Sequence, residues 1–179
     1  MTQTDPLGNE PQGATTAPAV QFDVDTLKQA SLGVKVAIGG AAVTFIAAFM
    51  TWGKVNLPSE LSVFGVATSA SGMDGGDGKL TVLMAIAVGA LCVVQLIKGW
   101  NKGMAIGAIV CASIATLVGI MNYFDIKDIS GDMPAGFDVS VSVGIGLYLT
   151  ILAGIAMVVG SVLHFKNSSA SSETPLPTI

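Results

Sequence analysis

The chain has 179 residues, of which 51% are hydrophobic and only 11% are charged. All eight cationic residues are lysines, and twelve carboxylates outnumber them, so the formal net charge is -4. Because nucleic-acid binding depends on clustered cations that neutralise phosphates, we exclude nucleic acid as a partner. The composition is that of a membrane protein without a second, soluble domain.

The N-terminal residues 1–33 are polar, rich in Pro, Gly and Thr, and lack apolar periodicity, so we expect a disordered cytoplasmic tail. A secretory signal would place basic residues directly before a short apolar core, whereas this acidic tail precedes a full-length apolar run. We therefore expect the first apolar run to be retained as a membrane helix. Residues 166–179 have a similarly simple composition and are predicted to form a second disordered cytoplasmic tail.

Four long apolar runs lie between the tails, at residues 36–52, 80–97, 104–123 and 143–165. Each approaches the roughly 20 residues that a helix needs to cross a hydrocarbon core about 30 Å thick. None of them contains an internal Asp, Glu, Lys or Arg. The sequence therefore predicts an all-α membrane protein, with a four-helix transmembrane bundle over residues 34–165, two outer loops and disordered termini.

The lysines predict how the bundle lies in the plasma membrane. Cytoplasmic segments next to membrane helices carry an excess of lysine, so the side with more lysines is assigned to the cytoplasm. Both termini are therefore expected to be cytoplasmic. On that side lie Lys28, Lys35, Lys98, Lys102 and Lys166, whereas the two outer loops hold Lys54, Lys79 and Lys127.

Small residues recur at every fourth position of the predicted third helix, which aligns them in one ridge and lets another helix backbone approach closely. The predicted fourth helix carries similar sets. These ridges predict helix packing within the chain, and a homo-oligomer interface is the alternative use of the same residues. They are Gly103, Gly107, Cys111, Ala115 and Gly119 on the third helix, and Gly146, Thr150, Gly154 and Gly160 on the fourth.

The sequence contains no constellation typical of an enzyme. The nucleophile turn Gly-x-Ser-x-Gly is absent, and the only histidine, His164, falls at a membrane boundary beside Lys166. Cys92 and Cys111 lie inside apolar runs with no His or carboxylate beside them, so we interpret both as packing residues. We expect no catalytic residue, no cofactor and no metal site. The lack of ionisable groups at membrane depth also argues against an ion-coupled transporter.

The two outer loops hold the polar residues that are available for interaction. Residues 62–70 alternate loosely between apolar and polar types and can form a short strand. A turn rich in Gly and Asp follows at residues 71–79, where calcium is an alternative that the spacing disfavours, since it is not that of an EF-hand. Four carboxylates are our candidates for an outer interaction surface: Asp74 and Asp77 in the first loop, and Asp128 and Asp132 in the second.

Three segments carry a family resemblance: residues 46–52 (IAAFMTW), residues 72–81 (GMDGGDGKLT) and residues 142–149 (SVGIGLYL). An acidic lead at residues 25–28 (DTLK) and the pair Gly39-Gly40 precede them and belong to the same pattern. In this order they resemble a group of small four-helix membrane proteins of actinobacteria and their phages, over most of residues 25–165. A Pro that commonly stands just before the Trp of the first segment is Thr51 here. The resemblance implies a four-pass topology and brings no catalytic residue with it.

Four-pass proteins encoded by mycobacterial prophages are implicated in defending the lysogen against other phages, sometimes with a cytoplasmic partner. The resemblance therefore implies superinfection exclusion through protein–protein interaction, with the lipid bilayer as surroundings and a cytoplasmic effector as a candidate partner. A host envelope scaffold or regulatory membrane protein is the first alternative. A small oligomeric pore, such as a holin, is the second.

Overall fold

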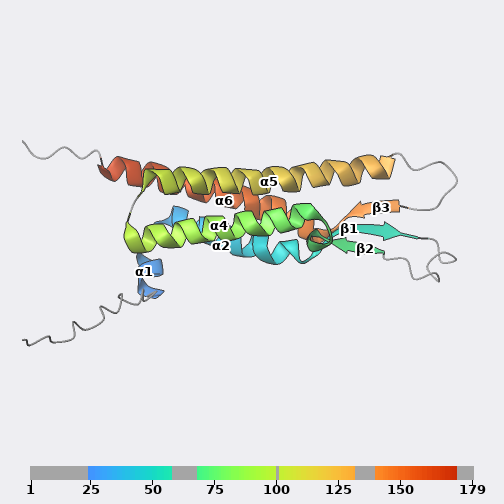
Figure 1. Ribbon diagram of the computed structural model, residues 1–179, viewed down its shortest axis with the longest axis horizontal. Helices are drawn as coiled ribbons and strands as arrows, with labels where there is room; N and C mark the ends of the chain where they lie inside the picture. The colour runs from blue at the N-terminus through green and yellow to red at the C-terminus, as the bar shows by residue number, and fades with distance from the viewer. Residues whose placement is uncertain (1–23, 58–67, 100, 132–139, 173–179) are drawn as a thin grey trace, which may run out of the picture.

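A computed structural model of the protein describes residues 24–57, 68–99, 101–131 and 140–172. Four helices run side by side, and a small three-stranded sheet lies at one end of them (Figure 1). We call this the sheet end, and the opposite end, where the described chain begins and finishes, the tail end (Figure 1). The helices are α2 (Leu32–Ala48), α4 (Gly76–Lys98), α5 (Lys102–Gly131) and α6 (Ile145–Ser172), with a short α1 (Val24–Gln29) at the tail end.

The four long helices form a closed ring in the order α2, α4, α5 and α6, and the most extensive contact is between α2 and α6. Three of the described helices, α4, α5 and α6, are long and apolar enough to cross a membrane. The fourth, α2, has 17 residues and is shorter. The prediction of a mainly helical protein with long apolar helices is therefore confirmed, whereas a membrane crossing by α2 stays a prediction. The structure also contains a small sheet.

Large apolar side chains cover the outside of the bundle, and small ones fill its inside. Ala37, Ala112 and Ala115 are fully buried, together with the hydroxyl-bearing Thr44 and Thr150. This distribution is the one expected in lipid, where apolar side chains gain nothing by turning inward and small residues let helices approach. The large exposed residues include Val43, Phe45 and Ile46 on α2, Leu83 and Ile86 on α4, Val110 and Leu117 on α5, and Leu152, Ile155 and Val159 on α6.

The prediction that the first helix reaches Trp52 is wrong, because α2 ends at Ala48 and Trp52 lies in strand β1 (Thr51–Asn56). The Trp52 indole donates a hydrogen bond to the Ala47 carbonyl oxygen at 3.0 Å and satisfies one of the free acceptors at the helix end. The ring is only 4% exposed and packs in a small second core with Ala48 and Leu147. Trp52 is therefore a core residue.

Two helices extend beyond their predicted ends. α5 continues to Gly131 instead of ending at residue 123, so its 30 residues span about 45 Å, roughly 15 Å more than the hydrocarbon core. The extension packs against strand β3 (Ser140–Val143), which explains why the helix continues. α6 runs to Ser172, which corrects the prediction that disorder begins at residue 166.

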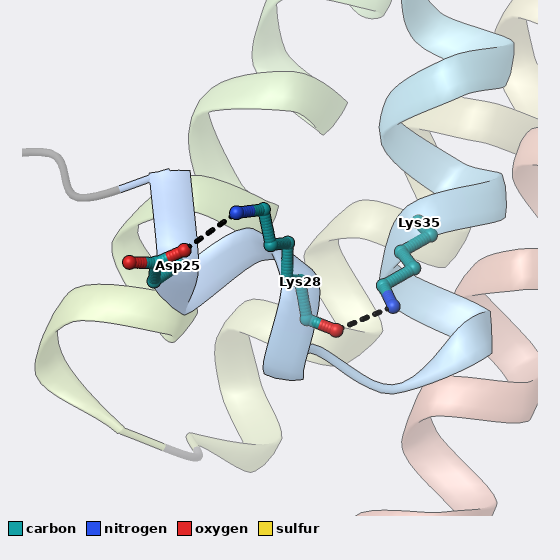
Figure 2. A network of polar contacts seen from close by, with 3 residues as sticks. All are labelled: Asp25, Lys28 and Lys35. Carbon is teal, nitrogen blue, oxygen red and sulfur yellow. Dashed lines mark hydrogen bonds and ion pairs between the residues drawn. The ribbon is translucent and has the colours of Figure 1, made fainter.

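The tail predicted over residues 1–33 is also partly ordered, since α1 and the start of α2 fall within it. Figure 2 shows the contacts that hold α1. The Lys35 ammonium donates a hydrogen bond to the Lys28 carbonyl oxygen at 2.7 Å, and Lys28 pairs with Asp25 at 2.7 Å. The remaining tail positions, 1–23 and 173–179, lie outside the described residues.

The sheet has strand order β2-β1-β3, with β1 in the centre and both pairings antiparallel. Strand β2 (Ser69–Ser71) leads into a single 3-10 turn, η1 (Gly72–Asp74), and then into α4. Strand β2 covers the last positions of the segment that the alternation predicted, and residues 62–67 lie outside the described part. Because β1 follows α2 and β3 precedes α6, the sheet continues the packing of this helix pair.

Candidate functional site

A cleft of about 470 Å³ opens between the sheet and the sheet ends of α4 and α5. Three strands and two helices contribute to it, so residues from four separate stretches of the chain meet there. Apolar and polar side chains both line the cleft. The apolar ones are Trp52, Val55, Ala70, Ile126 and Val141, and the polar ones include Lys54, Ser71, Asp74, Asp77 and Asn122.

Asp74 is held in place by the turn in which it lies. Its Oδ2 atom accepts hydrogen bonds from the Ser71 backbone N–H at 2.6 Å and from the Ser71 hydroxyl at 3.0 Å. These bonds favour the charged carboxylate and hold the pKa of Asp74 below its ordinary value. The carboxylate is exposed, so the turn presents a fixed negative charge at the cleft.

Asp77 is the second carboxylate of the cleft, and it lies in the first turn of α4. A negative charge is favourable there, because the free N–H groups of a helix start carry partial positive charge. The Asn122 side chain of α5 donates from Nδ2 to Asp77 Oδ2 at 3.1 Å and to the Val118 carbonyl oxygen at 3.0 Å. This contact ties α4 to α5 beside the cleft.

Glycines 72 and 78 let the turn lie directly against its neighbours. A Cβ atom on Gly72 would lie 2.7 Å from the Ala48 carbonyl oxygen, and one on Gly78 would overlap the backbone of Gly72. The Gly-rich segment therefore has a packing role that explains part of its composition. It does not gather metal ligands, since the described residues contain no group of three or more His, Cys, Asp or Glu that could hold an ion.

The four predicted interaction carboxylates do not lie together in the structure. It brings Asp74 and Asp77 to the same cleft. Asp128 is exposed on the extension of α5 and does not line the cleft, and Asp132 lies outside the described residues. The sequence reasoning missed Lys54, Asn122 and the apolar lining. Asn122 could have been selected from the sequence, because it is one of the few amides within the apolar runs.

The glycines of α6 lie where helices approach most closely. A Cβ on Gly160 would lie 2.6 Å from the Ala37 nitrogen and 2.7 Å from the Gly33 carbonyl oxygen of α2. Gly146 is similarly close to the Ala47 carbonyl oxygen, at 2.9 Å. Two further predicted packing residues of α6 are buried. Thr150 donates to the Gly146 carbonyl oxygen at 2.9 Å, and a Cβ on Gly154 would lie 2.6 Å from Thr116 Oγ1 of α5.

The predicted ridge on α5 is divided between two neighbours. At the sheet end, Ala115 is fully buried and a Cβ on Gly119 would lie 3.1 Å from the Ile151 side chain of α6. At the tail end, a Cβ on Gly107 would meet only Leu91 of α4, at 3.5 Å. Cys111 is half-buried with a free thiol, and Gly103 is exposed. Tight packing against another helix is therefore confined to the sheet-end half of this ridge.

A polar cluster joins three helices near the tail end. His164 Nε2 of α6 lies 2.9 Å from Gln95 Oε1 of α4, and His164 Nδ1 lies 3.4 Å from the hydroxyls of Ser31 and Ser168. Gln95 is 5% exposed, and its Nε2 atom has no partner among the described residues. The His164 ring thus links α6 to α4 and to the residue before α2. The cluster is therefore a structural tie between α6, α4 and the start of α2.

No protein-family model, curated protein or solved structure matches the chain.

Proposed function

We propose that the chain is a four-pass protein of the plasma membrane with both tails in the cytoplasm. α2 is enclosed on two sides by α4 and α6, and its remaining surface carries exposed Val43, Phe45 and Ile46, which suit contact with lipid. Its 17 residues span about 25 Å, so a small local thinning of the bilayer brings both ends to the interfaces. The excess of lysine at the tail end assigns that end to the cytoplasm.

The cleft at the sheet end carries our functional proposal. In this orientation it faces the outside of the cell, and it combines apolar lining with the exposed carboxylates Asp74 and Asp77. Interfaces gain most of their affinity from an apolar or aromatic side chain that fills a pocket, with charges around it setting specificity. We therefore infer that the protein acts non-enzymatically, by binding a protein segment that presents an apolar side chain next to Lys or Arg.

We infer that this binding excludes superinfecting phages, with a phage injection component or its receptor as the partner and the tails available to a cytoplasmic effector. The motif resemblance to prophage-encoded four-pass proteins supports this role, and the cleft supplies an accessible surface. A pore through one bundle does not fit the packing, because Val34, Val88, Ala112 and Met157 fill its centre. A host envelope scaffold needs the same cleft but gives no protection against phage.

A plating assay tests the exclusion proposal. The chain is expressed in a mycobacterial host, a panel of unrelated phages is plated, and membrane potential is followed before infection. We expect wild-type protein to lower plating efficiency for some phages at normal potential. Unchanged plating at normal potential would replace exclusion with the scaffold role, and depolarisation without phage would replace it with an oligomeric pore.

A matched pair of charge reversals tests the cleft. Asp77→Lys should abolish protection, because it places a cation where the partner's cation binds. Asp128→Lys makes the same change on an exposed carboxylate at the same end but outside the cleft, so protection should persist. Equal protection by both variants, at equal membrane levels, would remove the cleft from the proposal.

Single cysteines test the topology separately, in a background with Cys92→Ala and Cys111→Ala. Lys28→Cys and Asn56→Cys place exposed thiols before and after α2. A membrane-impermeant maleimide added to intact cells should label only Asn56→Cys. Labelling of both positions from the same side would show that α2 does not cross the bilayer.

A further inference from the structure

A shallow groove of about 220 Å³ lies on the surface of the bundle between α2 and α4. These two helices make the least extensive contact of the four neighbouring pairs. A Cβ atom on Gly89 would meet only Ala41 Cβ, at 4.0 Å, whereas one on Gly160 in the α2–α6 contact would overlap backbone atoms. Small residues therefore leave space here instead of closing the contact. The groove is lined by Ile38, Ala41, Ala42 and Phe45 of α2 and by Ala85, Ile86 and Gly89 of α4.

A cation lies on the same side of α2 as the groove. Lys35 is exposed and precedes Ile38 by three residues and Ala42 by seven, spacings that place residues on one helix face. Its ammonium carries three donors, of which one bonds the Lys28 carbonyl oxygen (Figure 2), so the group can also bind an anion.

The dimensions of the groove match one leaflet of a bilayer. Lys35 and Phe45 are ten residues apart on α2, which corresponds to about 15 Å along the helix axis. Half of a hydrocarbon core about 30 Å thick is the same length. A lipid whose phosphate lies at Lys35 therefore has its acyl chain alongside the groove residues.

We propose that this groove binds an anionic phospholipid of the tail-side leaflet, with one acyl chain between α2 and α4 and the phosphate held by Lys35. The acyl chain fills apolar space that the protein leaves open. The Lys35 ammonium selects an anionic headgroup over a zwitterionic one, because basic residues near the membrane surface attract anionic lipid. The proposal depends on α2 crossing the bilayer, as set out above.

Native mass spectrometry of the purified full chain tests the site, with dioleoylphosphatidylglycerol and dioleoylphosphatidylcholine as probes. We expect one phosphatidylglycerol per chain, retained in preference to phosphatidylcholine. Gly89→Leu fills the groove without touching backbone and should weaken phosphatidylglycerol binding at least tenfold. Gly39→Leu is the matched control, because a Cβ there meets nothing within 4 Å and Gly39 does not line the groove. Lys35→Gln keeps a donor for Lys28 but should abolish the headgroup preference.

Equal binding by wild type, Gly89→Leu and Gly39→Leu would overturn the proposal, as would equal retention of the two lipids by wild type. A dimer that only Gly89→Leu disrupts would assign the groove to a second copy of the chain. The cysteine labelling on the two sides of α2 distinguishes failure of the lipid site from failure of the proposed topology. Opposite-side labelling with no lipid retained removes the lipid site alone, whereas same-side labelling removes the topology as well.

Discussion

Gly160→Ala should separate α2 from α6. The added Cβ would lie 2.6 Å from the Ala37 nitrogen and 2.7 Å from the Gly33 carbonyl oxygen, whereas ordinary contact begins at 3.4 Å, so the helices must move apart by roughly 0.8 Å. The atoms that it meets are backbone atoms of α2, which cannot rotate away as a side chain does. A gap of this size removes about a quarter to a half of each dispersion contact around it.

The net effect follows from two opposing contributions. Overpacking costs about 1–3 kcal/mol, and we expect about 3 here because backbone must shift. Replacing Gly by Ala within a helix returns about 1 kcal/mol. We therefore expect Gly160→Ala to lower the free energy of unfolding by about 2 kcal/mol. Gly89→Ala is the control, since its Cβ has 4.0 Å of space and only the gain of about 1 kcal/mol applies.

Equilibrium unfolding in mixed micelles of increasing dodecyl sulfate content measures both variants, with helicity followed by circular dichroism. The two alanine variants should differ by about 3 kcal/mol in the free energy of unfolding, with wild type between them. If Gly160→Ala proves as stable as Gly89→Ala, the close approach of α2 and α6 is not the arrangement in the membrane.

Three further predictions concern individual contacts. Trp52→Phe removes the indole donor to Ala47 and should cost about 1 kcal/mol in the same unfolding experiment, whereas Trp52→Ala should cost about 3–5 because it also empties the second core. Because hydrogen bonds lower the pKa of Asp74, the η1 turn should persist above the ordinary carboxyl pKa and open only as pH falls through the lowered value. The chemical shift of the Ser71 amide, followed by NMR, measures this opening, and Asp74→Asn should abolish its pH dependence. His164→Ala removes the partner of the buried Gln95 amide and should lower the free energy of unfolding by about 1–3 kcal/mol, which a second change, Gln95→Leu, should largely restore. If the two substitutions instead lower the stability additively, His164 and Gln95 do not form a structural tie.

The apolar runs could be read from the sequence because lipid fixes the length and composition of a spanning helix whatever its neighbours are. The ends of the helices could not be read from the sequence. α2 stops at Ala48 because the Trp52 side chain folds back onto Ala47, and α5 continues to Gly131 because it packs against β3. Both causes are contacts between residues that local sequence does not bring together.

The same distinction applies to the cleft. Asp74 and Asp77 could be selected because a polar loop between two apolar runs must face water. Val55 and Val141 could not be assigned to one cleft, because they become neighbours only through pairing of β1 with β3. The ridges of small residues were visible in the sequence, but which ridge meets which helix depends on the order of helices around the ring.

Pairing of β1 with β3 also sets an order of assembly. The Asn56 and Ser140 side chains that meet at the end of this pair are 84 residues apart, and all of α4 and α5 lies between them. During synthesis the edge of β1 that pairs with β3 therefore stays unpaired until β3, the last strand, has been made. Long-range pairing of this kind is slow. A chain truncated before residue 140 would leave this edge of β1 open, and unpaired strand edges make incompletely folded chains prone to pair with one another and aggregate.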